Sequence, residues 1–356
     1  MPKIRVLVVE DSLTVRKRLV EVITSDPALE VVAEGENGQQ AIDLCRALRP
    51  DVITLDMHLP ILDGVSATEH IMGHFPTPIL IVSSSTNRGD LFKTYDALAA
   101  GAVDVLEKPL TDEVDGVWER KFLAAIKMVS RIRVITHIRA RLAGAGRAAP
   151  ALPVGLPAPA RGGDQGHSVI ALGASTGGPG ALVDVLRGIP VGLPLTMLVV
   201  LHIDEPFSSA FAEWLESQTS HPVSYARGGE SLADGKGRVF MAPPGRHLAV
   251  MGGKVGLSSA PERNWCRPSV DVLFEALARE CARDVVACLL TGMGRDGADG
   301  LLALRRAGAH TIAQDEATSI IYGMPREAAL LGAAERILPL GEIGAAVTRV
   351  ATKGGK

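Results

Sequence analysis

The sequence predicts an α/β protein with two doubly wound parallel-sheet domains, joined by a helix and a linker rich in Pro, Ala and Gly. In both halves of the chain, short β-branched runs alternate with helical patterns, which is typical of parallel sheets covered by helices. The runs are apolar throughout, as expected of strands buried on both faces. The stretch at residues 143–166 is rich in Pro, Ala and Gly and lacks the side chains needed for a core.

The composition limits the classes of protein that fit. The chain has 356 residues, of which 47% are hydrophobic and 22% charged, enough for about two packed domains. A net charge of -3 gives no electrostatic drive toward nucleic acid or anionic membranes. Four scattered cysteines without a CxxC pair argue against a zinc site or a disulfide framework. No apolar run is long enough for a signal sequence or a membrane span, so we expect a cytoplasmic protein without membrane insertion or a nucleic-acid partner.

Five short apolar runs in the first region are predicted strands. They alternate with segments in which apolar residues recur at helical spacing. The predicted strands are residues 4–9, 31–33, 51–55, 79–82 and 103–106, with helices at residues 12–24 and 39–48.

A connecting region separates two α/β regions. Residues 117–142 have apolar positions at helical spacing, interleaved with basic residues, and are predicted to form a helix before the linker at residues 143–166. We therefore expect a domain at residues 1–125, a helical extension and linker at residues 126–166, and a second domain at residues 167–356. The strands predicted in the second domain are residues 169–172, 196–201, 239–241 and 285–290, and helical patterns follow Pro179, Phe207, Ser269 and Ala298.

Polar side chains follow several predicted strands of the first domain. Glu10 and Asp11 end the first strand, Asp56 the third and Ser83 the fourth, and Lys108 follows the fifth. Doubly wound sheets bind ligands at this edge, and three carboxylates there repel one another unless a cation such as Mg²⁺ lies among them. A carboxylate beside Mg²⁺, a hydroxyl and a lysine can accept a phosphoryl group. Taken singly, Asp11 is equally explained as a helix cap and Lys108 as a surface residue.

The joint pattern VVEDS, TLDMHLPILDG, IVSSS and EKP resembles the receiver domain of two-component response regulators, over roughly residues 3–125. This resemblance implies a flavodoxin-like fold and phosphorylation of Asp56 by a partner sensor histidine kinase. The implied Mg²⁺ ligands are Glu10, Asp11 and Asp56, and the implied phosphoryl contacts are Ser83 and Lys108.

The stretch VIALGASTGGPG at residues 169–180 is a predicted buried strand that enters a glycine turn. It lacks the GxGxxG pattern of dinucleotide sites and the lysine of a Walker loop, but residues 173–177 fit the GxSxG elbow. A serine on a sharp strand-to-helix turn projects its hydroxyl outward, close to the unpaired N–H groups of the helix start. Ser175 is therefore either a nucleophile or an N-cap of the following helix.

A serine nucleophile needs a base, and the base needs an acid that orients it. Among nine histidines, His202 is the one that ends an apolar run, so we expect it at the same sheet edge as Ser175. The alternative is a strand-end histidine that bonds a loop backbone. Asp296 follows another strand in a glycine-rich loop and is the acid candidate, and the backbone N–H of Met293 in that loop is a candidate oxyanion donor.

Six motifs together resemble the chemotaxis protein-glutamate methylesterase family (CheB type): GASTGGP, LHIDEPFSSAFAEWL, MAPPGRHL, RPSVDVLF, TGMGRDGADGL and AQDEATSIIYGMPREA. The likeness covers nearly the whole chain apart from the linker. It implies a Rossmann-like hydrolase domain that removes γ-methyl esters from receptor glutamates, releases methanol, deamidates certain receptor glutamines and needs no cofactor for the esterase. In the implied site Ser175 attacks, His202 takes its proton and Asp296 orients His202. Backbone groups near Thr176 and Met293 bind the oxyanion.

Two other interpretations stay open on the sequence. A response regulator with a non-enzymatic output would carry a basic helix-turn-helix or winged module, whereas the second domain offers Ser, His and Asp at strand ends. A hydrolase of small esters would share the triad and differ in its substrate. Methanol release from methylated receptor, compared with turnover of a generic ester, separates these two hydrolases.

Overall fold

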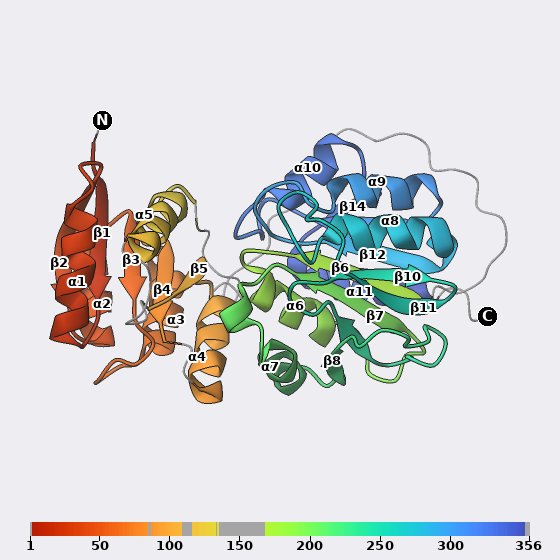
Figure 1. Ribbon diagram of the computed structural model, residues 1–356, viewed down its shortest axis with the longest axis horizontal. Coiled ribbons are helices and arrows are strands. Elements are labelled where there is room, and N and C mark those ends of the chain that lie inside the picture. The colour runs from red at the N-terminus through yellow and green to blue at the C-terminus, as the bar shows by residue number, and fades with distance from the viewer. Residues whose placement is uncertain (1, 85–86, 109–115, 133, 135–167, 353–356) are drawn as a thin grey trace. The chain divides into compact units, whose positions relative to one another are not determined.

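The structure is a computed structural model, and it describes residues 2–84, 87–108, 116–132, 134 and 168–352. The linker predicted at residues 143–166 lies outside the described residues. The chain divides into two compact units, residues 1–146 and 147–356, which Figure 1 colours from red to yellow and from green to blue. Each unit is described by itself.

The first unit is built on a five-stranded parallel sheet with strand order β2-β1-β3-β4-β5. This is the flavodoxin-like order, in which the chain crosses from one side of β1 to the other. The predicted fold class of this domain is confirmed. The strands are β1 (Ile4–Val9), β2 (Leu29–Gly35), β3 (Val52–Leu55), β4 (Ile79–Ser83) and β5 (Asp104–Glu107), and the helices are α1 (Leu13–Thr24), α2 (Gly38–Leu48), α3 (Gly64–His74), α4 (Arg88–Ala99) and α5 (Val117–Val129).

The second unit is built on a seven-stranded parallel sheet with strand order β14-β13-β12-β6-β7-β9-β8. Its strands are β6 (Val169–Ala174), β7 (Thr196–Leu201), β8 (Val223–Tyr225), β9 (Val239–Met241), β12 (Val285–Leu289), β13 (His310–Gln314) and β14 (Arg336–Leu338). Its helices are α6 (Gly178–Arg187), α7 (Phe211–Gln218), α8 (Val270–Glu280), α9 (Ala298–Arg306), α10 (Met324–Leu330) and α11 (Leu340–Thr352), with short 3₁₀ turns η2 (Glu205–Phe207) and η3 (Ala282–Asp284).

In each sheet, the strand that comes first in the chain marks the place where the strand order reverses. From β1 the chain runs to β2 on one side and later to β3 on the other, and from β6 it runs to β7 on one side and later to β12 on the other. Both β1 and β6 are buried over most of their length. In open α/β sheets, ligands bind at the carboxyl ends of the strands beside this reversal, so the topology places a candidate site after β1 and another after β6.

The structure departs from the sequence prediction in several places, and β8, β13 and β14 are strands that the sequence analysis did not predict. The helix predicted at residues 117–142 ends at Val129, where the Ser130 hydroxyl donates to the Lys127 carbonyl and competes with further helix; residues 135–142 lie outside the described residues. The second unit also carries an antiparallel hairpin, β10 (His247–Met251) and β11 (Lys254–Ser258), outside the parallel sheet. Among the described helices, none is both long and apolar enough to cross a bilayer.

Candidate functional site

The first unit gathers carboxylates at the carboxyl ends of β1 and β3. Register pairs Val9 with Leu55, and the Asp56 N–H donates to the Val9 carbonyl at 3.1 Å, so Glu10 and Asp56 emerge side by side. Both are almost fully buried, whereas Asp11 is exposed. One carboxylate oxygen from each of Glu10, Asp11 and Asp56 lies within 4.8 Å of the other two. Hard oxygen donors at this spacing fit a cation of the Mg²⁺ class.

Lys108 is bonded to this carboxylate cluster. Its Nζ lies 2.8 Å from Glu10 Oε2 and 3.0 Å from Asp56 Oδ2. Burial alone would lower the pKa of Lys108, but the Asp56 and Glu10 carboxylates outweigh burial and raise it. Burial, together with the charge of Asp56, raises the pKa of Glu10 despite the bond to Lys108. The cluster therefore retains unfavourable charge that a bound cation would offset.

Ser83 ends β4 beside Lys108. The Lys108 N–H donates to the Ser83 carbonyl at 3.0 Å, and the Ser83 side chain is fully buried. Among the described residues, the Ser83 hydroxyl has no hydrogen-bond partner. A buried hydroxyl without a partner is costly unless a ligand satisfies it, so this atom points to a group that binds beside Asp56.

Arg16 on α1 supports the acidic turn, and the sequence analysis did not identify it. Its guanidinium donates to the Glu10 carbonyl at 2.6 Å and pairs with Glu34 at 3.2 Å and Glu36 at 2.8 Å. The side chain is nearly buried although α1 is a surface helix. Helical spacing alone carries no signal that this arginine turns inward, because its partners come from β2 and the loop that follows it.

In the second unit, Ser175 and His202 follow neighbouring strands at the same level. Register pairs Ala174 of β6 with Leu201 of β7, and the His202 N–H donates to the Ala174 carbonyl at 3.1 Å. On the other side of β6, the Ser175 N–H donates to the Thr291 carbonyl at 3.0 Å. The prediction that these residues meet at one sheet edge is therefore consistent with the strand register.

His202 is joined to Asp296, the third predicted member. The His202 Nε2 lies 2.9 Å from Asp296 Oδ2. Burial alone would lower the pKa of His202, but the bond to Asp296 and the contact with Cys266 outweigh burial and raise it to about 9. Within the described residues no hydrogen bond joins the Ser175 hydroxyl to His202; such bonds are often long in a ligand-free hydrolase and tighten when substrate binds.

Asp296 belongs to the loop between β12 and α9, and its carboxylate lies against the N-terminus of α8. The strand pattern does not predict this contact. Its carboxylate accepts from the Ser269 hydroxyl at 2.7 Å and from the Val270 N–H at 2.6 Å. Burial would raise the pKa of Asp296, and the bonds from His202, Ser269 and Val270 hold it below its usual range. The positive end of the helix dipole acts in the same direction. Asp296 is therefore a fixed anion that can orient an imidazole.

Cys266 touches the other nitrogen of His202. The Cys266 Sγ lies 3.8 Å from His202 Nδ1 and donates to the Asn264 carbonyl at 3.3 Å. The sequence analysis treated this cysteine as one of four scattered thiols, and its place beside RPSVDVLF is the only signal that could have suggested a role.

Backbone N–H groups at Thr176 and Met293 are available to bind an anion. Among the described residues, neither N–H has an acceptor, and both residues are at least partly exposed. The Thr291 hydroxyl ties the two loops together by donating to the Thr176 carbonyl at 3.0 Å. Gly292 allows this close approach, since a Cβ there would lie 2.7 Å from the Ser175 Cβ. These features suit the stabilisation of an oxyanion.

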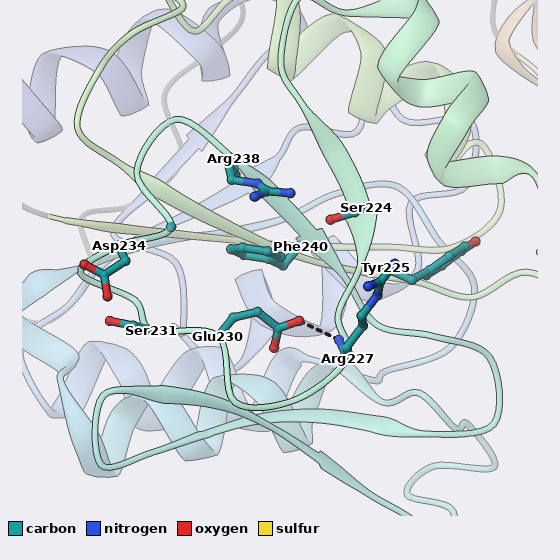
Figure 2. A pocket seen from close by; sticks show the side chains of 9 residues that line it. Ser224, Tyr225, Arg227, Glu230, Ser231, Asp234, Arg238 and Phe240 are labelled. Atoms are coloured by element: carbon teal, nitrogen blue, oxygen red, sulfur yellow. Dashed lines mark hydrogen bonds between the residues drawn. The ribbon is translucent and has the colours of Figure 1, made fainter.

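A separate pocket of about 400 Å³ lies along β8 and β9. Figure 2 shows the Arg238 side chain over the Phe240 ring, with the guanidinium carbon 5.4 Å from the ring centroid, and Glu230 bonded to the Arg227 backbone. None of the predicted site residues lines this pocket. The predicted catalytic residues therefore lie at the strand ends and outside this pocket.

Comparisons with known proteins match the two units to two families. Residues 170–347 match the family described as CheB methylesterase, and residues 6–114 match the response regulator receiver domain. A protein-glutamate methylesterase/protein-glutamine glutaminase of Nitrosospira multiformis is 42% identical over 99% of this chain and 98% of its own. A second such enzyme, from Anaeromyxobacter dehalogenans, is 42% identical over 96% of this chain and 95% of its own. The crystal structure of the Thermotoga maritima CheB methylesterase catalytic domain is 31% identical, covers 51% of this chain and 98% of that chain, and has a TM-score of 0.49.

Proposed function

The chain belongs to the CheB-type family of protein-glutamate methylesterases that carry a receiver domain, and we propose that it hydrolyses glutamyl γ-methyl esters on methyl-accepting receptors and deamidates certain receptor glutamines. The observation that best supports this is the strand register that aligns Ser175 with His202, together with the bond from His202 to Asp296. A DNA-binding output has no support, because residues 170–347 match the methylesterase family.

In the proposed reaction the Ser175 hydroxyl attacks the ester carbonyl carbon and its proton passes to His202. Nδ1 of His202 is the acceptor, because Nε2 is held by Asp296. The methoxide leaves with that proton as methanol, and a water molecule then hydrolyses the glutamyl–serine ester with His202 as base again. A glutamine side chain follows the same route with ammonia as the leaving group.

The negative oxygen formed by this attack needs donors that are already in place. The free N–H groups of Thr176 and Met293 are the proposed donors, since neither has another acceptor among the described residues. Fixed donors of this kind stabilise the transition state without reorganisation.

In the receiver, Asp56 is the proposed phosphoryl acceptor and a sensor histidine kinase the proposed donor. Glu10, Asp11 and Asp56 would hold Mg²⁺, which offsets the charge of the phosphoryl oxygens. Lys108 and the unpartnered Ser83 hydroxyl would contact the same oxygens. The close packing of the three carboxylates supports this ligand set.

We further propose that phosphorylation of Asp56 activates the esterase. We propose a receiver at residues 1–125, a connecting segment at residues 126–166 and a methylesterase domain at residues 167–356. The matched segments fall within these bounds. A tenfold change in activity needs a difference of only about 1.4 kcal/mol between the docking free energies of the phosphorylated and the unphosphorylated receiver. The cytoplasmic location stays a prediction.

The test measures methanol release from a methylated receptor fragment by full-length protein, the Asp56→Asn variant and the fragment 167–356. We expect acetyl phosphate with Mg²⁺ to activate the full-length protein about tenfold and to leave Asp56→Asn unchanged. Chelation of Mg²⁺ should remove the activation and leave the basal rate. If the donor has no effect and the fragment is no faster than the full-length protein, the receiver does not restrain the esterase. If no methanol appears while a generic ester turns over, the substrate is not a receptor.

A further inference from the structure

Trp265 is the most exposed large apolar side chain in the described part of the chain, with 94% of its surface open to solvent. The other two tryptophans, Trp118 and Trp214, are 4% and 1% exposed. Exposed tryptophans of this kind are enriched at the centres of protein–protein interfaces. Along the chain, Trp265 lies between β11 and α8, in the segment that also supplies Cys266.

The backbone at Trp265 adopts a conformation that side chains normally avoid. Asn264 and Trp265 have φ of 53° and 62°. Arg263 and Cys266 close the turn with two backbone hydrogen bonds of 3.2 and 2.9 Å. A two-residue turn with positive φ at both central positions is of type I′ and favours Asn-Gly. Here the second position holds tryptophan, so the chain retains a strained residue where glycine would be easier, which is typical of functional sites.

This turn is attached to the catalytic groups on both sides of Trp265. The Asn264 amide donates to Asp296 at 3.2 Å and to Asp271 at 2.7 Å. On the other side, the Cys266 thiol lies 3.8 Å from His202. The indole is therefore held at the rim of the catalytic centre by a turn whose anchors are two members of the triad.

Exposed groups next to Trp265 in the chain and at the Ser175 turn suit an acidic, partly apolar peptide. Arg267 is exposed and donates to the Ala260 carbonyl at 3.3 Å, and among the described residues no carboxylate pairs with it. Met293, 45% exposed, follows Gly292, which packs against Ser175. A segment with several glutamates and glutamyl esters presents carboxylates to the arginine and apolar side chains to the indole.

We propose that Trp265 is the docking residue for the receptor segment that carries the methyl ester. Its indole packs on apolar side chains of that segment and positions the ester over Ser175. This inference rests on the proposed function and adds a residue that determines which segment is accepted.

The kinetic test uses full-length protein, activated with acetyl phosphate and Mg²⁺, and a methylated receptor fragment. Trp265→Ala and Trp265→Gly should both raise KM about tenfold or more while kcat stays within about twofold, as for loss of uniform binding. Because glycine adopts the positive φ of this position without strain, Trp265→Gly separates the effect of losing the indole from the effect of backbone strain. The control is Met251→Ala, which removes another exposed apolar side chain (77%) from the β10 hairpin and should leave KM unchanged.

A second measurement needs no turnover. Because Trp118 and Trp214 are buried, acrylamide should quench mainly Trp265 fluorescence in the free protein. Adding the methylated fragment to the Ser175→Ala variant should shift the emission to shorter wavelength and protect it from acrylamide. Ser175→Ala with Trp265→Phe should show neither change.

The two measurements distinguish the failures. If Trp265→Gly recovers the wild-type KM, or if receptor binding leaves the fluorescence and its quenching unchanged, the docking role is wrong even though methanol is released. If the wild type releases no methanol, the proposed function fails, and the fluorescence titration still decides whether Trp265 contacts the fragment.

Discussion

The two sheets place their sites in the same position and fill it with different chemistry. In both, the site follows the first strand, where the strand order reverses. After β1 come Glu10 and Asp11, and after β6 comes Ser175 in a glycine turn, where the Thr176 N–H has no acceptor among the residues that the structure describes. In both units the topology determines where the site lies, whereas the few residues after each strand determine its chemistry.

The carboxylates of the two sites differ in how they are satisfied. Asp296 accepts hydrogen bonds from His202, Ser269 and the N-terminus of α8, so its charge is already balanced by fixed donors. Glu10 and Asp56 instead share one lysine and lie close together. A saturated carboxylate orients a neighbour, and an under-satisfied pair attracts a cation or reacts.

The largest effect should come from replacing, one at a time, the proposed nucleophile Ser175 and the proposed phosphoryl acceptor Asp56. Ser175→Ala should lose at least about 10⁴-fold in methanol release, because it removes the proposed nucleophile, and should still be phosphorylated by acetyl phosphate. Asp56→Asn should lose phosphorylation and keep the basal methanol release. Assaying both reactions on both variants checks this. Loss of both activities in either variant would mean that the two sites do not act separately.

A smaller effect is expected from Gly292→Ala. The new Cβ would lie 2.7 Å from the Ser175 Cβ and also meet the Met324 sulfur, so the nucleophile turn must shift. A displacement of about 1 Å at a nucleophile can cost about 10²-fold in rate, while phosphorylation should be unaffected.

Gly256→Ala is the matched control for this change, because its Cβ meets nothing closer than 3.9 Å. The measurement is kcat on methylated receptor, with circular dichroism to monitor folding. Wild-type kcat in a folded Gly292→Ala protein would show that the close approach is not required.

The smallest effect concerns the pH dependence. The neutral form of His202 is the base, so activity is low below its pKa and should rise as pH increases through about 9. Burial lowers the pKa of His202, and the bond to Asp296 and the contact with the Cys266 thiol raise it. Cys266→Ala should therefore move the midpoint of kcat/KM from about 9 toward the ordinary imidazole value of about 6.5.

Cys281→Ala is the control for the pH experiment, since this thiol packs against the core of the same domain and is not a neighbour of His202. A profile that is identical in wild type and Cys266→Ala would exclude the thiol as a cause of the raised pKa. The phosphorylation of Asp56, which uses no histidine in the receiver, should not change in either variant.

Most of the long buried strands, and the polar residues that follow them, could be predicted from the sequence. Glu10, Asp56, Ser175 and His202 could be located because parallel strands are continuous apolar runs and their carboxyl ends share one edge. Strands β8, β13 and β14 were not predicted. The three-residue strands β8 and β14 carry little periodic signal, whereas the equally short β9 was found because its residues are apolar throughout.

Which groups surround these strand ends depends on the tertiary structure alone. Cys266 and Asn264 come from a turn before α8, and Ser269 from its N-cap, none of which follows a sheet strand directly. They reach His202 and Asp296 because α8 packs its N-terminus against the loop after β12. Contacts between segments about 30 to 60 residues apart depend on how helices pack on the sheet, and local patterns of polarity do not encode that packing.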